Sequence, residues 1–196
     1  MRFLLKLILC LLLAVAAGFG FLALRSGDAV YSLYEWVSPA RFQQYDKLIS
    51  SVAAERQLDP MLVKAVVWRE SRFDRKKTGN AGERGLMQVS AKAAGEWARE
   101  NKIDNFKLDD LFEPKTNLEA GSWYLRRALD HWQTESDALP FALAEYNAGA
   151  SRAQRWVGDG GISAKDFLAK IDFPVTRQYV KSILDRYAFY KKRGRM

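Results

Sequence analysis

The sequence predicts a mainly α-helical protein, with one helical domain preceded by a single N-terminal transmembrane helix. Three observations lead to this prediction. The first 25 residues are almost entirely apolar, apolar residues recur at helical spacing along the rest of the chain, and no segment shows a convincing strand-like alternation. The chain has 196 residues, of which 48% are hydrophobic and 28% charged, so its composition is that of a globular protein with room for one domain.

Residues 1–25 are expected to form a transmembrane anchor. The stretch from Leu7 to Leu24 carries no charge, and a helix of its length spans about 27 Å, close to the ~30 Å hydrocarbon core of a bilayer. A signal peptide cleaved after Ala14-Val15-Ala16 is the alternative. We favour the anchor because the apolar stretch continues past that site up to Arg25.

Either interpretation exports the rest of the chain. Arg2 and Lys6 favour a cytoplasmic N-terminus, which places the domain outside the membrane. The net charge of +8 suits an anionic partner such as a cell-wall polymer or lipid headgroups, and export makes nucleic acid an unsuitable one. We therefore expect a linker over 26–40, a folded domain over 41–196, and no nucleic-acid partner.

The exported part is expected to fold as successive helices joined by polar loops. Apolar residues at helical spacing predict the first helix over 45–53. Asp59 as N-cap and Pro60 at the first helical position open the second, which runs to about Ser71. Residues 74–85 are expected to be irregular, with at most a short hairpin within 78–89. Further helices are expected over 90–100, 114–132 and 139–147, the last ended by Gly149, and after Ser163 and Pro174.

The residue counts exclude several kinds of chemistry. One His and one Cys cannot build a four-ligand zinc site or a disulfide framework within the chain. A nucleophile activated by a histidine base would need His131, which a packed or surface position on its helix explains better. We therefore expect no metal and no cofactor, and an enzymatic function would depend on carboxylates, hydroxyls, amides and aromatic side chains.

Glu70, near the end of the second helix, is the main catalytic candidate. It shares a helix face with the apolar residues three, four, seven and eight positions before it, which are Val67, Val66, Val63 and Leu62. Loss of hydration on that face raises the pKa of a carboxyl group toward the range of a general acid. The alternative is a solvent-exposed Glu70 at the helix end, paired with Arg69 or Arg72.

Three motifs along the chain favour the catalytic interpretation. Glu70-Ser71 is followed by Gly85-Leu86-Met87-Gln88 and later by Glu145-Tyr146-Asn147-Ala148-Gly149. In this order and spacing they resemble the Slt-type lytic transglycosylases, bacterial enzymes with a goose-type-lysozyme-like fold. The resemblance covers roughly residues 45–190 and implies a single lysozyme-like helical domain with a substrate groove. Further matching residues are Asn117, Gly121, Tyr124, Leu125, Pro174, Thr176, Arg177, Tyr179 and Val180.

The resemblance also implies roles for individual residues. Glu70 would be the catalytic acid and base. Ser71 would lie by the scissile sugars, while Met87 and Gln88 would line the groove and contact substrate. Tyr146 would form one wall of the groove and, with Asn147, place the sugar next to Glu70.

Three further positions are interpreted beside the family pattern. Val175 stands where the family often has a glutamate before the threonine of the C-terminal motif, which removes any groove contact that this acid makes. Glu83 adds a second carboxylate near the glycine motif, and we count it among the substrate-binding candidates. Glu145, beside Tyr146 on a helix, is expected on the solvent side.

The resemblance implies cleavage of the bond between N-acetylmuramic acid and N-acetylglucosamine in peptidoglycan, with formation of 1,6-anhydro-muramyl ends. One glutamate serves this reaction as acid and then as base. A hydrolytic muramidase and a catalytically silent wall-binding or assembly module are the alternatives. The expected partners are peptidoglycan glycan strands and the membrane, through the N-terminal helix. The expected location is the bacterial envelope, with the domain in the periplasm or secreted after signal cleavage.

Overall fold

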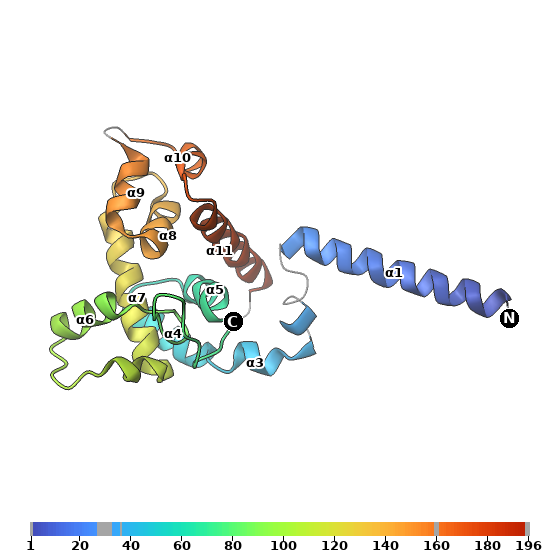
Figure 1. Cartoon of the computed structure of the whole chain (residues 1–196), viewed down its shortest axis with the longest axis horizontal. Coiled ribbons are helices and arrows are strands. Elements are labelled where there is room, and N and C mark those ends of the chain that lie inside the picture. Colours follow the sequence, from blue (N-terminus) through green and yellow to red (C-terminus); the bar gives the residue numbers. More distant parts are fainter. Residues whose placement is uncertain (1, 27–32, 36, 159–160, 195–196) are drawn as a thin grey trace. The chain divides into compact units, whose positions relative to one another are not determined.

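The computed structural model describes residues 2–26, 33–35, 37–158 and 161–194, and it divides into two compact units, Met1–Gln43 and Gln44–Met196 (Figure 1). The first unit contains α1 (Arg2–Ser26) and α3 (Pro39–Gln43). The expected linker over 26–40 includes residues 27–32 and 36, which lie outside the described residues. Its bounds, and those of the flanking domains, stay a prediction.

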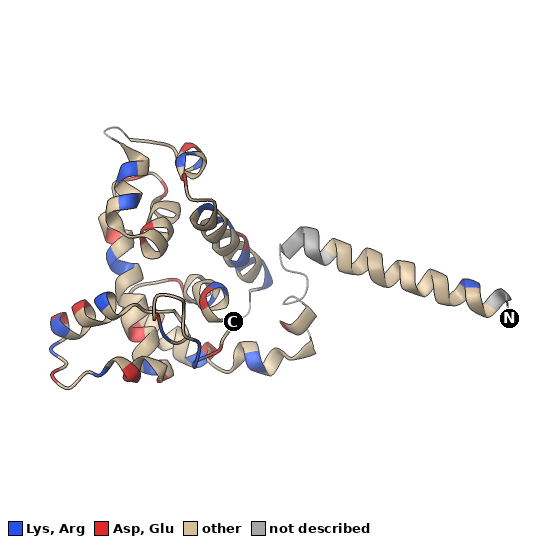
Figure 2. Ribbon diagram, in the orientation of Figure 1, with Lys and Arg blue, Asp and Glu red and all other residues tan. Residues whose placement is uncertain are grey.

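Helix α1 is long and apolar enough to cross a membrane over Leu4–Phe21, by length and composition alone. Its only charged residue in that stretch is Lys6, and the ribbon of α1 is otherwise tan over the part drawn in colour (Figure 2). A signal sequence meets the same criteria. The prediction of an apolar N-terminal helix is therefore confirmed, whereas the choice between anchor and signal peptide stays open.

The second unit is built from helices, which confirms the predicted mainly α-helical fold. The region expected to form a hairpin contains two isolated antiparallel β-bridges, Thr78–Arg84 and Arg84–Val89. No β-strand forms within the described residues. The elements are α4 (Asp46–Glu55), α5 (Pro60–Ser71), α6 (Ala91–Glu100), η1 (Leu108–Phe112), α7 (Pro114–His131), α8 (Ala138–Ala148), α9 (Ala150–Val157), α10 (Ala164–Lys170) and α11 (Pro174–Arg193).

The capping residues set the starts of α5 and α6 as expected. Asp59 accepts a hydrogen bond from the Met61 amide at 2.8 Å, and Pro60 occupies the first turn, so α5 begins there and ends at Ser71. Ser90 accepts a hydrogen bond from the amide of the third helical residue of α6 at 3.2 Å. Local side-chain chemistry therefore fixes both helices that border the irregular segment.

Two elements differ from the expectation. Gly149, expected only as the end of α8, also precedes α9, because its φ of 88° turns the chain and lets a new helix begin at the next residue. The short helix η1 forms where no helix was expected. Only the start of α9 bears on function, because Gly149 lines the cavity described below, whereas η1 contributes no residue to it.

Helix α5 lies in the core of the second unit. Its residues 62–68 are all buried, and it packs against α4 and α11 while α8 contacts both α7 and α11 (Figure 1). Lys64 is buried on α5, where its ammonium lies 2.7 Å from the Asp46 carboxylate. The burial of α5 places its last turn, with Glu70, at the edge of the core.

Candidate active site

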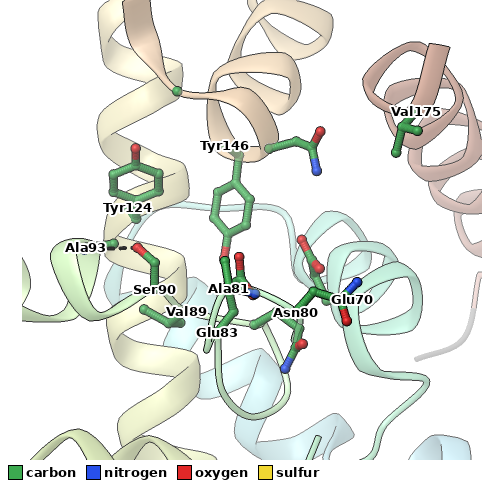
Figure 3. Close-up of a pocket in the computed structure, with 13 residues that line it drawn as sticks. Glu70, Asn80, Ala81, Glu83, Val89, Ser90, Ala93, Tyr124, Tyr146 and Val175 are labelled. Atoms are coloured by element: carbon green, nitrogen blue, oxygen red, sulfur yellow. Dashed lines mark hydrogen bonds between the residues drawn. The ribbon is translucent and has the colours of Figure 1, made fainter. Parts of the chain in front are cut away.

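A cavity of about 570 Å³ opens at the end of α5. The segment after α5, the start of α6, and helices α7, α8 and α11 all contribute to its wall (Figure 3). The lining residues are Glu70, Asn80, Ala81, Glu83, Gln88, Val89, Ser90, Ala93, Tyr124, Tyr146, Asn147, Gly149 and Val175. The cavity thus brings together five sequence-predicted residues from distant parts of the chain, namely Glu70, Glu83, Gln88, Tyr146 and Asn147.

The carboxyl group of Glu70 has a raised pKa. Burial is the largest cause, and the negative charge of Glu83 adds to it. A hydrogen bond from Tyr179 and the positive charges of Lys77 and Arg69 act in the opposite direction, so the pKa of Glu70 rises from 4.5 to about 7. This direction is the one expected from the apolar face of α5, and it keeps much of the carboxyl protonated near neutral pH.

The Tyr179 hydroxyl donates a hydrogen bond of 2.6 Å to Oε1 of Glu70. Burial, together with the charge of Glu70, raises the pKa of Tyr179 well above its usual value, so the phenol stays a neutral donor. Arg72, expected as an alternative partner of Glu70, instead donates to the Trp68 carbonyl at 2.9 Å. The contact with α11 therefore orients the Glu70 carboxyl at the cavity wall.

The Tyr146 side chain extends from α8 and lies between Tyr124 and Glu70 (Figure 3). Its hydroxyl donates to the Met87 carbonyl at 2.9 Å, and its ring meets that of Tyr124 edge to face at 5.5 Å between centroids. Burial raises the pKa of Tyr146 well above the usual value. A neutral, fixed aromatic ring of this kind provides a wall against which a sugar ring can pack.

Two amides line the cavity beside the tyrosines. Asn147 is exposed and accepts a hydrogen bond of 2.8 Å from the Thr176 hydroxyl through Oδ1. Gln88 donates through Nε2 to the carbonyls of Lys77 and Gly85, both at 3.0 Å. Each amide is oriented by its protein partner, and an amide retains further donor and acceptor capacity for a polar ligand.

Asn117 on α7 holds the glycine motif in place. The Asn117 side chain is fully buried and makes three hydrogen bonds, accepting from the Met87 amide at 2.7 Å and donating to the carbonyls of Arg84 and Leu111 at 2.7 and 2.8 Å. Gly85, with φ of 75°, lies so close to Asn117 that a Cβ there would collide with it. The sequence placed Asn117 among the family-matching residues without indicating its role.

The expectation that the Met87 side chain lines the groove is wrong. Met87 is fully buried against Gly121 and Ser122 of α7, and only its carbonyl reaches toward the cavity, where Tyr146 binds it. Ser71 is buried too, and its hydroxyl donates to the Val67 carbonyl at 3.2 Å. Neither residue is among those that line the cavity, because both face inward from the elements that carry the motif.

Glu145 is buried, contrary to the solvent-side position expected for it. It is 3% exposed, and its Oε2 accepts a hydrogen bond of 2.8 Å from the indole of Trp132. The same oxygen lies 2.7 Å from His131 Nδ1. His131 is thus an exposed residue at the end of its helix, one of the two positions that the sequence predicted, and it lies outside the cavity lining. Glu145 joins α8 to the end of α7 and supports the turn that carries Tyr146.

Sequence reasoning missed two residues beside Glu70. Tyr179 stands among the family-matching residues without a role, and its contact with Glu70 joins positions 109 residues apart, which no local pattern reveals. Lys77 donates through its ammonium to the backbone carbonyl of Glu70. No sequence signal distinguishes this lysine from its neighbours Arg75 and Lys76.

A helical domain with one high-pKa carboxyl in a cavity lined by tyrosines and amides has the architecture of lysozyme-like folds. The family model described as "Transglycosylase SLT domain" matches residues 47–167. The chain therefore belongs to the transglycosylase SLT domain family, and the predicted resemblance is confirmed.

Curated relatives carry related names. The chain is 31% identical over 150 residues to the soluble lytic murein transglycosylase of Salmonella typhimurium, covering 75% of this chain and 23% of the relative. It is 30% identical over 117 residues to the membrane-bound lytic murein transglycosylase F of Pseudomonas putida, covering 58% of this chain and 22% of the relative. The chain spans about a quarter of the length of these relatives.

Solved structures show the same fold. The lytic transglycosylase Slt of Pseudomonas aeruginosa, an inactive mutant, superposes with a TM-score of 0.71 at 26% identity, covering 77% of this chain and 24% of that one. A 70-kDa soluble lytic transglycosylase in complex with bulgecin A superposes with a TM-score of 0.73 at 27% identity, covering 82% and 26%. Both similarities confirm the predicted fold class.

Proposed function

We propose that this chain is a peptidoglycan lytic transglycosylase in which Glu70 acts as acid and then as base. The observation that carries the proposal is the Glu70 carboxyl, with a pKa of about 7, at the wall of a cavity lined by tyrosines and amides. Family membership and the names of the relatives support the same reaction. The substrate is the glycan strand of peptidoglycan.

In the first step, protonated Glu70 donates its proton to the oxygen of the bond between N-acetylmuramic acid and N-acetylglucosamine. The bond from this oxygen to the anomeric carbon of the muramyl sugar breaks, and the N-acetylglucosamine leaves with a free hydroxyl group. A carboxyl whose pKa lies near the operating pH is suited to this, since it is protonated in a useful fraction of molecules and still transfers its proton readily. Tyr179 binds Oε1, which leaves Oε2 for the glycosidic oxygen. Tyr146 and Asn147 hold the muramyl sugar beside it.

In the second step, the Glu70 carboxylate accepts the proton of the muramyl 6-hydroxyl, whose oxygen closes on the anomeric carbon. The nucleophile belongs to the substrate, so ring closure uses proximity and needs neither a water molecule nor an enzyme nucleophile. The bond from Tyr179 stabilises the carboxylate formed in between. One carboxyl therefore suffices where glycosidases generally use two.

Digestion of purified peptidoglycan tests the role of Glu70. Glu70→Gln keeps the shape and removes the acid, and we expect the rate to fall by about 10³-fold, within the range for loss of a general acid. Glu100→Gln, at the exposed end of α6, is the matched control and should cleave at the wild-type rate. An unchanged rate for Glu70→Gln would refute the assignment.

Hydrolysis is the second candidate, because Glu83 places another carboxylate at the wall of the same cavity. Its Oε2 accepts a hydrogen bond from the Ala81 amide at 3.1 Å, which fixes its position in the loop. If Glu83 activates a water, the muramyl ends are reducing and heavier by one water than anhydro ends. In that case Glu83→Gln abolishes the reducing products, whereas a transglycosylase keeps its anhydro products in this variant.

We further infer that α1 anchors the chain in the cytoplasmic membrane with the catalytic domain in the periplasm. The apolar span Leu4–Phe21 and the membrane-bound relatives support this location. Membrane fractionation with an intact-mass measurement tests it. An uncleaved chain in the membrane fraction is expected, and a soluble chain that has lost its first residues would show signal cleavage instead.

A further inference from the structure

Lys77 lies in the loop after α5, and it contacts three different parts of the site. Its ammonium donates a hydrogen bond to the backbone carbonyl of Glu70, in the last turn of α5. Its own carbonyl accepts hydrogen bonds from the Gly85 amide at 2.9 Å and from Nε2 of Gln88 at 3.0 Å. One residue therefore links the end of the helix that carries Glu70 to the glycine motif and to a side chain of the cavity wall.

The backbone around Lys77 is held by hydrogen bonds across the loop. The Gly85 amide binds the Lys77 carbonyl on one side of the turn. Two residues further along, the Gly79 amide donates to the Glu83 carbonyl at 2.7 Å. The loop is thus turned back on itself, and the Lys77 side chain starts from a fixed point near the end of α5.

The ammonium of Lys77 meets the carbonyl end of a helix. The last carbonyls of a helix have no partner within it, and the helix dipole favours a positive charge at this end. The chain leaves the helix at Arg72, the C-cap of α5, whose φ is 53°. Lys77 then supplies both a hydrogen-bond donor and a charge to the last turn of α5.

The charges of Lys77 and Glu70 favour each other. Burial is the largest influence on the pKa of Glu70 and raises it, while the positive charge of Lys77 lowers it. Burial also lowers the pKa of Lys77 from its usual 10.5, and the charge of Glu70 opposes this change. Since Lys77 is not among the residues that line the cavity, its influence on the reaction passes through Glu70.

Other groups near the Glu70 carboxyl differ from Lys77. They are two neutral phenols, one cation and one carboxylate, namely Tyr179 of α11, Tyr146 of α8, Arg69 of α5 and Glu83 of the loop. The Arg69 guanidinium lies over the Tyr179 ring, 5.5 Å from its centre. The ammonium of Lys77 instead binds the backbone of Glu70 itself, so it combines a charge with a hold on the catalytic residue.

We propose that Lys77 is a positioning residue for Glu70. Its ammonium fixes the end of α5 and places a positive charge beside the carboxylate that forms when Glu70 gives its proton to the glycosidic oxygen. Lys77 keeps its own proton throughout the reaction. The inference rests on the proposed function, because it assigns Lys77 a role in the ionised state of Glu70 between the acid step and the base step.

The pH dependence of cleavage by the full chain tests the proposal. Lys77→Met removes the charge and leaves the backbone carbonyl that binds Gln88 and Gly85. We expect kcat to fall by about threefold, the size of one partly exposed charge pair, while KM stays unchanged because Lys77 does not line the cavity. The fall of kcat/KM at alkaline pH should move to higher pH, by about the half unit to which a threefold change in proton affinity corresponds.

Lys76→Met is the matched control. It removes the same charge from the neighbouring residue, whose ammonium lies 5.2 Å from the centre of the Phe112 ring, and we expect the wild-type kcat and pH profile. Lys77→Arg keeps a charge and a donor and should restore the wild-type profile. A wild-type profile in Lys77→Met, an equal shift in Lys76→Met, or a shifted profile in Lys77→Arg would overturn the proposal.

A direct titration of Glu70 separates this inference from the proposed function. NMR of the isotope-labelled full chain in detergent follows the Glu70 carboxyl carbon, whose signal is identified by its absence in Glu70→Gln. The titration midpoint should be higher in Lys77→Met than in the wild type and unchanged in Lys76→Met. A midpoint that does not move would overturn the role of Lys77, even if the chain cleaves peptidoglycan. If the midpoint moved and the wild type cleaved no peptidoglycan, the proposed function alone would fail.

Discussion

Opposing influences set the protonation of the Glu70 carboxyl. Burial raises its pKa, and the hydrogen bond from Tyr179 lowers it without restoring the ordinary value, so the result is about 7. An exposed glutamate at this helix end would ionise near its ordinary pKa. The molecule instead keeps a carboxyl that is costly to ionise, which is the condition expected of a residue used for proton transfer.

The effect of Glu70→Gln on the free energy of unfolding depends on pH. The folded-state pKa of Glu70, about 7, lies above the unperturbed value of 4.5. Between these two pH values the Glu70 carboxyl is mostly ionised in the unfolded chain and mostly protonated in the folded chain. Stability is therefore lost as the pH rises through this window, and the loss is complete above it. We expect the variant to raise the free energy of unfolding by roughly 1–3 kcal/mol at about pH 8 and by little at about pH 4. Urea unfolding at both pH values measures this, and equal gains would contradict it.

Tyr179→Phe removes the donor that lowers the Glu70 pKa. The pKa of Glu70 should rise further, so the fall of kcat/KM at alkaline pH should move to higher pH, with a rate loss of roughly tenfold at the optimum from the less stabilised carboxylate. Tyr187→Phe is the matched control on the same helix, since its hydroxyl binds Asp59 at 2.8 Å, away from the cavity. If the pH profile of kcat/KM for Tyr179→Phe equalled that of the wild type, this contact would be structural only.

Helix α7 positions the loop between α5 and α6 through Asn117. Asn117→Ala leaves the Met87 amide and the carbonyls of Arg84 and Leu111 without this partner in a buried place. We expect the free energy of unfolding to fall by about 2–4 kcal/mol and kcat to fall with it, because Gln88 and Glu83 lie on the same loop. Chemical denaturation measures the change. Asn101→Ala, at an exposed residue after α6, should cost far less, and equal costs would contradict this role.

The elements show what the sequence could predict. Capping by Asp59 and Ser90 placed α5 and α6 correctly, because capping is local chemistry. Helix α9 was not predicted, because a glycine with positive φ ends one helix and also permits another to begin directly after it. Local signals specify where a helix begins or ends better than they specify how the chain continues after a break.

The site shows a similar division between local and long-range information. The spacing of apolar residues placed Glu70 on a buried face, and family motifs brought Gln88, Tyr146 and Asn147 to one cavity. The direction of Met87 and the burial of Glu145 were missed, because they depend on Ser122 in α7 and on Trp132 directly after it, which contact them only in the folded chain.

At the scale of the whole molecule, the two compact units suggest separate tasks. We expect a fragment of residues 41–196 to unfold cooperatively without detergent and to cleave soluble glycan fragments with the kcat/KM of the full chain, because the cavity and its supporting helices all lie within it. Thermal unfolding and product release measure both properties. Aggregation of the fragment, or loss of its activity, would show that the N-terminal unit takes part in folding or catalysis.

Cleavage in water enriched in heavy oxygen tests the central claim most directly. If Glu70 acts alone as acid and base, mass spectrometry will find muramyl products with 1,6-anhydro ends that lack one water and carry no heavy oxygen, and Glu70→Gln will release almost none of them. Reducing ends that carry heavy oxygen would contradict the single-glutamate mechanism and establish water as the acceptor.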